Sequence, residues 1–282
     1  MTMDVILANS KTHFLRSSFL PFELRYSNNS NACYKKHAHP EFSIGAVDSG
    51  VSDYINQHSK QEISTGSTVI INPEAVHSCN PKPGTDWSYK MLFIESDWLT
   101  QLQASILTTQ QNKFQPFKQN HSRCPILFRD FQSLIQILIK NESPLLVEES
   151  AITFFSALFI KDLNAPLQHN MIPKQTTHLA YQYISDNVDK NISISEIARE
   201  SGLSHFYLIH SFKKQYGITP YAYHMMMKIN KAKTLLKKGN DITSIAIDLG
   251  FSDQSHFHRH FKSIVAATPK QYKANKHSTI ND

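Results

Sequence analysis

The alternating residues His37, His39 and Glu41, followed later by His77, are the first group in the chain that could do chemistry. Side chains alternate across a β-strand, so on a strand the first three would point to one face. Imidazoles and a carboxylate gathered in this way suit Zn²⁺ or another divalent ion. They also suit the polar lining of a small-molecule pocket, or structural hydrogen bonds at the rim of a β-domain. We expect the pocket, with no resident cofactor, and keep the metal site and the structural role as alternatives.

A second group of binding residues lies near the C-terminus, on one face of each of two short predicted helices. Glutamine pairs well with the edge of adenine and arginine with that of guanine, so Gln254 and Arg259 could read a DNA sequence. Lysines on the same faces could neutralise phosphates. The expected DNA contacts are His205, Phe206, Ile209, His210, Lys213 and Lys214 in the first helix, and Gln254, Ser255, His258, Arg259 and Lys262 in the second.

The two helices belong to two copies of one pattern between residues 194 and 272. In each copy a short amphipathic stretch ends at a glycine, Gly202 or Gly250, and glycine readily takes the left-handed conformation that ends a helix. Ser204 or Asp253 then stands where it can cap the next helix. Two short helices joined by a glycine-containing turn predict a helix-turn-helix, whose second helix enters the major groove. The chain is therefore expected to contain two of these motifs.

Between the copies, the stretch from Tyr221 to Lys238 has apolar residues at helical spacing, with its lysines mostly on the other side. A helix of this length spans about 27 Å at 1.5 Å per residue. It could hold two recognition helices in successive major grooves, which lie roughly 34 Å apart.

These residues resemble the DNA-binding domain of the AraC/XylS family of bacterial transcription regulators. The resemblance is carried above all by Gly250–Lys262, with Thr268-Pro269 and Tyr272 behind it. It implies a sequence-specific, DNA-binding transcription regulator rather than an enzyme, with double-stranded DNA as partner and RNA polymerase as a candidate partner. Activation and repression both stay open. The family often has arginine where this chain has His210, which implies a weaker guanine contact from the first copy.

Residues 19–93 have the marks of a β-domain, because short apolar or alternating segments are separated by turn-forming residues. The segments that predict strands are Phe22–Tyr26, Phe42–Val47, Thr68–Ile71 and Ser88–Phe93. Short strands at this spacing suggest a sandwich or a jelly-roll barrel.

Three stretches of this region, His37–Gly45, Gly66–His77 and Trp87–Met91, resemble the cupin-like sensor domain of a subgroup of the same family. The resemblance implies a small effector held in the mouth of a barrel. The candidate effector-binding residues are His37, His39, Glu41, His77, Trp87 and Tyr89. Metal-binding cupins usually place the glutamate further from the second histidine than Glu41 lies, so the contrasting function, a metal-dependent cupin enzyme with a DNA-binding appendage, ranks second.

Two amphipathic helices are predicted at Leu127–Lys140 and Leu146–Lys161. Their apolar stripes could pack inside the chain or against a second subunit, and we expect a homodimer because two-fold symmetry is common in soluble oligomers. The polar, proline-bearing stretch 164–175 is a linker. The expected fold is α+β in two domains: a cupin-like β-barrel with appended helices at 1–163, and an all-α domain with both helix-turn-helix motifs at 176–282.

The charge of the chain is localised. Its 282 residues include 29 Lys and Arg against 23 Asp and Glu, a formal net charge of +6. Residues 176–282 hold 14 of these basic and 8 of these acidic residues, so the whole positive excess lies there. A positive charge confined to one domain is the electrostatic footprint of a nucleic-acid binder.

The cysteines and apolar runs indicate the compartment. Cys33, Cys79 and Cys124 are odd in number and lack a paired spacing, which indicates reduced thiols. The run Val5–Ala8 is too short for a signal peptide, and no stretch approaches the ~20 apolar residues of a membrane span. We expect a cytoplasmic protein without a membrane partner.

Overall fold

The computed structural model describes residues 4–8, 12–33, 35–107, 113–140, 142–163 and 174–274. The chain divides into two units, residues 1–141 with 150–169, and residues 142–149 with 170–282. Of the predicted linker 164–175, all but the last two residues lie outside the described ranges. The short segment 142–149, expected with the first domain, groups with the second unit.

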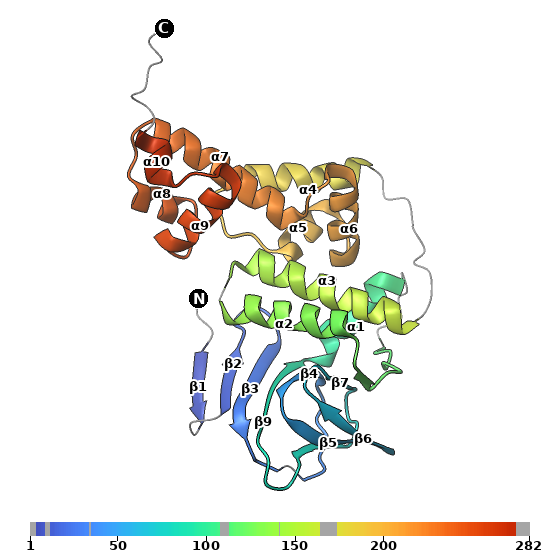
Figure 1. Cartoon of the computed structure of the whole chain (residues 1–282). Coiled ribbons are helices and arrows are strands. Elements are labelled where there is room, and N and C mark those ends of the chain that lie inside the picture. Colours follow the sequence, from blue (N-terminus) through green and yellow to red (C-terminus); the bar gives the residue numbers. More distant parts are fainter. Residues whose placement is uncertain are drawn as a thin grey trace. The chain divides into compact units, whose positions relative to one another are not determined.

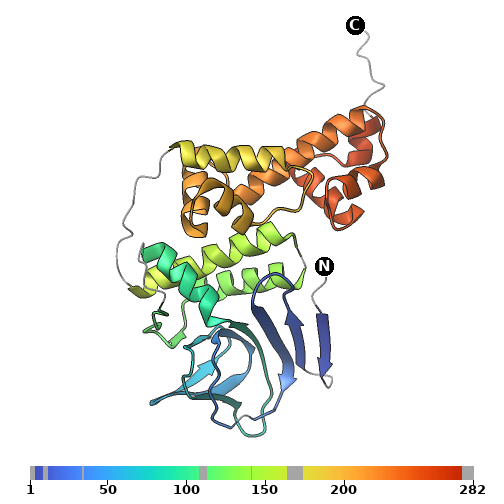
Figure 2. The same ribbon diagram turned by 180° about the vertical axis from the view of Figure 1, so that it is seen from behind.

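The first unit contains two antiparallel sheets, visible from both sides in Figures 1 and 2. The larger has the strand order β1-β2-β3-β9-β4-β7-β10 and the smaller has the order β6-β5-β8. Their bounds are β1 Asp4–Ala8, β2 Thr12–Arg16, β3 Phe22–Ser30, β4 Phe42–Ser49, β5 Val51–Asn56, β6 Ser59–Ser64, β7 Thr68–Ile71, β8 His77–Pro81, β9 Trp87–Ile94 and β10 His121–Ser122.

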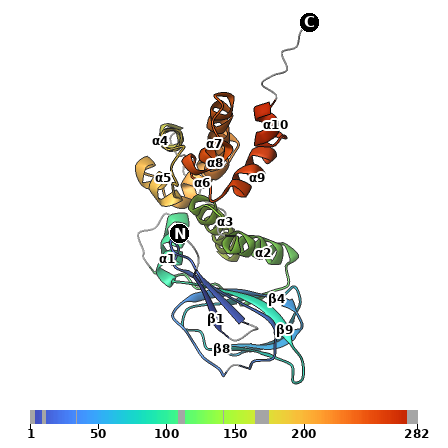
Figure 3. The same cartoon turned by 90° about the vertical axis from the view of Figure 1, so that its left-hand side faces the viewer.

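The strand β4, which lies between β9 and β7 in the larger sheet, explains how the interior is built. Its first six residues are all buried, and it pairs with β9 on one side and with β7 on the other. A side chain on Gly45 would overlap Met91 of β9, so only glycine lets the two strands and the methionine approach so closely at this point. The strands close around an interior, as Figure 3 shows from one side.

The apolar interior between the sheets is a cluster of buried residues. Tyr54 of β5 is fully buried, and its hydroxyl donates to the carbonyl oxygens of Ile70 and Asn120 at 3.3 and 3.2 Å, which satisfies its polar atom. The cluster consists of Val47, Tyr54, Ile63, Val69, Ile71, Ala75, Trp87 and Tyr89.

Three helices follow β9: α1 Ser96–Leu107, then α2 Pro125–Ile139 and α3 Pro144–Leu163, the two helices that the sequence predicted. The predicted stripes of α2 and α3 are buried, and Phe155 of α3 packs edge-on against Phe22 and Phe42 of the larger sheet, with ring centroids 6.2 Å apart in both cases. Packing inside the chain therefore accounts for most of these apolar residues. On α2 the exposed large apolar side chains are Ile126 and Ile139.

The second unit is helical, with α4 Lys174–Asp186, α5 Ile194–Ser201, α6 His205–Tyr216, α7 Pro220–Lys237, α8 Ile242–Asp248, α9 Gln254–Val265 and α10 Pro269–Ala274. The predicted α+β fold with two helix-turn-helix motifs is confirmed. None of the helices in the described ranges is long and apolar enough to cross a membrane.

Candidate DNA-binding helices and effector cavity

The first helix-turn-helix is formed by α5 and α6. Ser193 and Glu196 make a reciprocal capping box at the start of α5, and Gly202 ends that helix with a φ of 67°. Such a positive φ is easy for glycine and costly for most other residues, which explains the glycine in the turn. The Ser204 hydroxyl oxygen then accepts the Tyr207 amide at 3.4 Å, so the predicted N-cap of α6 is confirmed.

The outward face of α6 differs from the prediction in two places. His210, Lys213 and Lys214 are exposed, and His205 is half-buried, with a pKa that burial lowers. Ile209, however, is only 5% exposed, so its expected place on the polar face is wrong, and Phe206, an expected DNA contact, is only 3% exposed. The physical reason is that α6 buries a wide apolar face, in which these two residues join Leu208 and Phe212.

The second motif is formed by α8 and α9. Asp241 accepts the backbone amides of Thr243 and Ser244, and Gly250 turns the chain with a φ of 67°. Asp253 caps α9 by accepting the His256 amide at 2.7 Å, as predicted, and this bond lowers the pKa of Asp253.

The second recognition helix exposes the residues that the sequence singled out. Gln254, Ser255, Arg259 and Lys262 are exposed, and His258 is half-buried. Phe257 and Phe261 are fully buried on the other side, next to Ile245 and Ala246 of α8 in the same apolar cluster. Burial of one face thus fixes which residues of α9 reach solvent.

The spacer helix α7 packs Met225, Ile229, Ala232 and Leu236 into the cluster that supports α8 and α9. One of its lysines departs from the expected outward pattern: Lys228 is buried, with its ammonium 5.6 Å from the centre of the Phe251 ring. Burial lowers the pKa of Lys228 to about 8, and only the charge of Asp189 opposes that effect.

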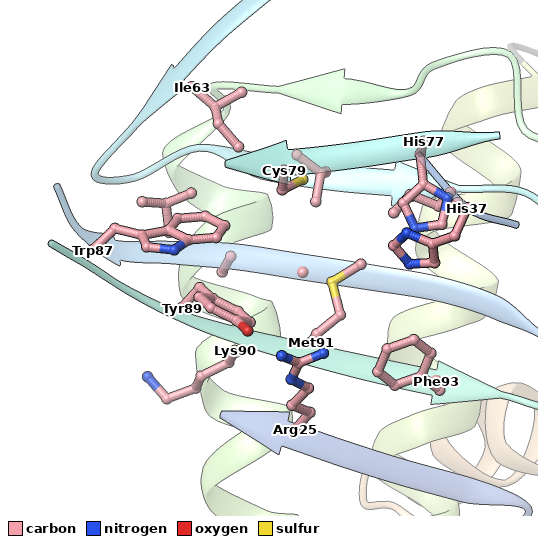
Figure 4. A pocket seen from close by; sticks show the side chains of 15 residues that line it. Arg25, His37, Ile63, His77, Cys79, Trp87, Tyr89, Lys90, Met91 and Phe93 are labelled. Atoms are coloured by element: carbon pink, nitrogen blue, oxygen red, sulfur yellow. The ribbon is translucent and has the colours of Figure 1, made fainter. Parts of the chain in front are cut away.

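A cavity of about 60 Å³ lies inside the first unit. Its walls are mostly apolar, and several are supplied by the buried cluster described above, including Val47, Ile63 and Val69. Trp87 and Tyr89, whose rings stack 4.3 Å apart, stand at one end, and His37 and His77 stand at the other (Figure 4). Four of the six predicted effector-binding residues therefore line one cavity.

His37 and His77 are brought together by backbone hydrogen bonds between the two residues, and not by a strand that runs through His37. Their amides and carbonyls exchange bonds of 3.0 and 2.8 Å in an isolated bridge, which places the two rings 4.4 Å apart. The expected strand through His37, His39 and Glu41 is wrong, because β4 begins only at Phe42. Burial lowers the pKa of His77 to about 4, so its imidazole is neutral at pH 7.

His39 and Glu41 do not line this cavity. They border a separate hollow together with Arg16, Glu23 and Glu95. The Nδ1 atom of His39 bonds to the Glu41 carbonyl oxygen at 2.9 Å, and burial lowers the pKa of His39. Its ring still lies 4.9 Å from that of His77, so the three histidines form a cluster without facing one common space.

Residues that the sequence did not single out also face the cavity. Arg25 of β3 and Met91 and Phe93 of β9 are among them, and Figure 4 shows the guanidinium of Arg25 beside Met91. Arg25 is cross-strand from Met91, and its guanidinium carbon lies 5.7 Å from the Tyr89 ring centre. A basic residue inside an otherwise alternating strand is the signal that could have identified it.

Among the described residues, the group whose ligand atoms lie close enough to hold a metal ion is Glu142, His256 and His260, in the second unit. The expected alternative set of His37, His39, Glu41 and His77 does not meet that geometry. Each of its three histidines instead has Nδ1 within 2.9 Å of a backbone carbonyl oxygen, which holds the ring in place.

Two family models match the chain. A helix-turn-helix domain matches residues 197–275, and an AraC-like ligand-binding domain matches residues 19–155. The uncharacterized HTH-type transcriptional regulator YbfI of Bacillus subtilis is 28% identical over 229 residues, which cover 79% of this chain and 81% of that protein. The arabinose operon regulatory protein of Escherichia coli is 31% identical over 136 residues, which cover 47% of this chain and 46% of that protein.

Among solved structures, the K231A variant of apo ToxT from Vibrio cholerae is similar over 92% of this chain and 99% of its own, at 17% identity and a TM-score of 0.39. The family of the chain is shown by the two sequence models. Together they cover both the cavity and the paired helix-turn-helix motifs. The chain therefore belongs to the AraC/XylS family of transcription regulators, with a ligand-binding domain followed by a DNA-binding helix-turn-helix domain.

Proposed function

We propose that this regulator binds its effector in the cavity of the first unit and thereby alters transcription from an operator bound by α6 and α9. The observation that carries the proposal is the cavity itself, which has apolar walls and a few polar groups at its ends, the usual composition of a small-molecule site. A ligand can act only by binding two arrangements of the protein with different affinity.

The lining indicates the chemistry of the effector. The indole Nε1 of Trp87 is buried and has no hydrogen-bond partner among the described residues, so it can donate to a ligand. Arg25 adds a positive charge, and the neutral imidazole of His77 adds a further polar contact. We infer a small, largely apolar effector that carries a hydrogen-bond acceptor or a negative charge. The volume of about 60 Å³ favours a compact molecule.

The proposed DNA contacts are the exposed side chains of the two recognition helices: His210, Lys213 and Lys214 on α6, and Gln254, Ser255, Arg259 and Lys262 on α9, with half-buried His205 and His258 at their margins. Arg259 and Gln254 can each make two hydrogen bonds to a base edge, so α9 is proposed to supply most of the sequence reading. The buried side chains of Phe206 and Ile209 contribute to the packing of α6.

We propose a cytoplasmic homodimer that contacts RNA polymerase at its promoters, and no enzymatic role. Most of the apolar residues of α2 and α3 are buried. The proposal of a dimer therefore depends on the exposed side chains of Ile126 and Ile139 and on how common two-fold symmetry is among oligomers. Light scattering should give twice the chain mass at tens of micromolar, and a monomer with and without DNA would exclude the dimer.

The effector site can be tested directly, because the chain has two tryptophans. Trp98→Phe leaves Trp87 as the sole indole, and its fluorescence should respond to small apolar monocarboxylates more strongly than to neutral molecules of the same shape. A reporter under the native operator should lose its response to the best compound in the His37→Ala/His77→Ala double variant. An unchanged reporter response in that variant would place the effector site elsewhere.

A further inference from the structure

A cluster of ligand-type side chains lies in the second unit, apart from the effector cavity. Glu142 stands just ahead of α3, and His256 and His260 lie one turn apart on α9. One ligand atom from each of the three falls within 4.8 Å of the other two. We propose that Glu142, His256 and His260 bind a divalent transition-metal ion of the Zn²⁺ type.

His256 is oriented as a metal ligand. It is only 5% exposed, its Nδ1 lies 3.1 Å from the Ser252 hydroxyl, and its Nε2 has no hydrogen-bond partner in the described part of the chain. Metal-bound histidines typically use their other ring nitrogen in this way, since the bond sets the tautomer and the ring orientation. Nε2 is thereby left to face the carboxylate of Glu142, 3.3 Å away.

The competing state is a charged imidazolium paired with Glu142. Burial opposes it, because desolvation is the largest influence on both histidines: it lowers the pKa of His256, and it lowers that of His260 to about 4. Neutral imidazoles present lone pairs, and a carboxylate beside two lone pairs attracts a cation. The positive charges of Arg259 and Lys228 act on His256 and oppose the binding of a cation. The three ligands must therefore coordinate the ion directly to offset this repulsion.

The donor set selects the metal. Two imidazoles and one carboxylate suit Zn²⁺ or a similar ion better than Mg²⁺ or Ca²⁺, which prefer oxygen ligands. Two histidines spaced i, i+4 on a helix are a recurrent pair in zinc sites. In a tetrahedral site with bonds of about 2.1 Å, ligand atoms lie about 3.4 Å apart. The candidate ligand atoms of Glu142, His256 and His260 lie within 4.8 Å of one another, so the side chains must approach by up to about 1.4 Å to coordinate one ion.

Tyr221 lies beside the cluster. The Tyr221 ring lies 6.4 Å from that of His260, and its hydroxyl is buried without a hydrogen-bond partner among the described residues. Burial raises the pKa of Tyr221, and the charge of Glu142 raises it further, so the hydroxyl keeps its proton and can donate to Glu142 or to a metal-bound water. A metal held here would link α9, which carries Arg259, to the segment that begins at Glu142.

The experiment uses the full chain, freed of metal with a chelator and titrated with Zn²⁺ against a chromophoric competitor, and with Co²⁺ for its visible absorption. We expect one equivalent to bind, a higher midpoint of thermal unfolding, and a tetrahedral Co²⁺ spectrum. Glu142→Gln and His260→Gln should each weaken binding by more than about 100-fold, because loss of outer-shell partners alone typically costs 10–100-fold.

Two control variants separate the sites. His258→Gln, on the same helix but outside the cluster, should keep full Zn²⁺ affinity, as should His39→Gln, which tests the three-histidine cluster of the first unit. Circular dichroism of each variant checks that it folds. Unaltered Zn²⁺ affinity in folded His260→Gln, or its loss in His39→Gln, would overturn the proposal, as would the absence of stoichiometric binding by the unsubstituted chain.

Discussion

Arg259 lies on the exposed face of α9, within the N-terminal half of that helix. The N-terminal residues of a recognition helix are those that contact base edges. A bidentate pair between arginine and guanine contributes about 1–3 kcal/mol of discrimination. Arg259→Ala should therefore weaken operator binding by about 1–3 kcal/mol and relax the preference at one base pair. Binding to a library of operator variants measures both effects.

The matched control for this prediction is Arg129→Ala. Arg129 is also exposed, pairs with Asp130 at 2.9 Å and lies on α2 of the first unit. It should leave operator affinity unchanged. If Arg259→Ala instead weakens binding evenly over all sequences, Arg259 contacts phosphate and Gln254 becomes the main reader of the sequence.

Lys228 provides a prediction about stability. Its pKa in the folded chain, about 8, lies below its ordinary value of 10.5, so the unfolded chain binds the proton more tightly. The free energy of unfolding should then rise as the pH increases from about 8 to 10.5, and the full penalty, about 3 kcal/mol, should apply at pH 7. Lys228→Met should raise the free energy of unfolding at pH 7 by up to that amount.

Urea unfolding of the full chain at pH 7 and at pH 10 tests this prediction, with Lys231→Met as the control. Lys231 is on the same helix but is exposed and pairs with Asp189 at 3.1 Å, so its replacement should change little. A less stable Lys228→Met protein at pH 7 would mean that the ammonium makes favourable contacts that outweigh its burial.

At the scale of single residues, the sequence predicted the capping side chains better than the burial of apolar ones. Ser204 and Asp253 follow a glycine turn, and this local chemistry decides their role wherever the helix packs. Ile209 and Phe206 could not be placed in the same way, because a short helix may bury a narrow or a wide face. Which face is buried depends on the neighbouring elements.

At the scale of elements, the first turns of α3 act as a cap for two other helices. Glu148 accepts the Ile194 amide at 2.5 Å at the start of α5, and Glu149 accepts the Tyr221 amide at 2.9 Å at the start of α7. Both carboxyl groups are buried within the second unit. Helix N-termini have unpaired amides and favour negative charge, so these residues stabilise the scaffold of the DNA-binding helices.

Glu149→Ala should therefore lower the free energy of unfolding by about 1–3 kcal/mol, the usual cost of leaving a buried amide without its acceptor. Glu149→Gln keeps an acceptor oxygen of similar shape and should recover much of the loss. The exposed Glu200→Ala serves as the control in denaturant unfolding. Equal stability of Glu149→Ala and Glu200→Ala would show that the Tyr221 amide finds another partner.

Elements with local signals were predicted well, and those defined by long-range pairing were not. The strand Thr68–Ile71 and the spacer helix follow from continuous apolar runs and from helical periodicity. The strands β1 and β2 were missed because β2 gains its place by pairing with β3, and β1 by pairing with β2. The contact between His37 and His77 is likewise a long-range bridge, and no periodicity within 37–41 could indicate it.

At the scale of the whole molecule, the two units divide the charge unequally. The positive excess lies in residues 176–282, which contain both recognition helices, while residues 1–175 are neutral overall. The lysines of α6 that face solvent, Lys213 and Lys214, are placed to neutralise phosphates. Because neutralised phosphates release counterions, this arrangement predicts how binding depends on salt.

The affinity of the full chain for its operator should fall steeply as salt rises, in a linear plot of log affinity against log salt concentration. Lys213→Ala and Lys214→Ala should each reduce the slope by about 1, with similar effects on operator and unrelated DNA, since phosphate contacts carry no sequence information. Lys36→Ala, an exposed lysine of the first unit, should leave the slope unchanged. A flat salt response would mean that α6 and α9 do not neutralise phosphates of the DNA backbone. An altered slope in Lys36→Ala would extend the DNA-binding surface onto the first unit.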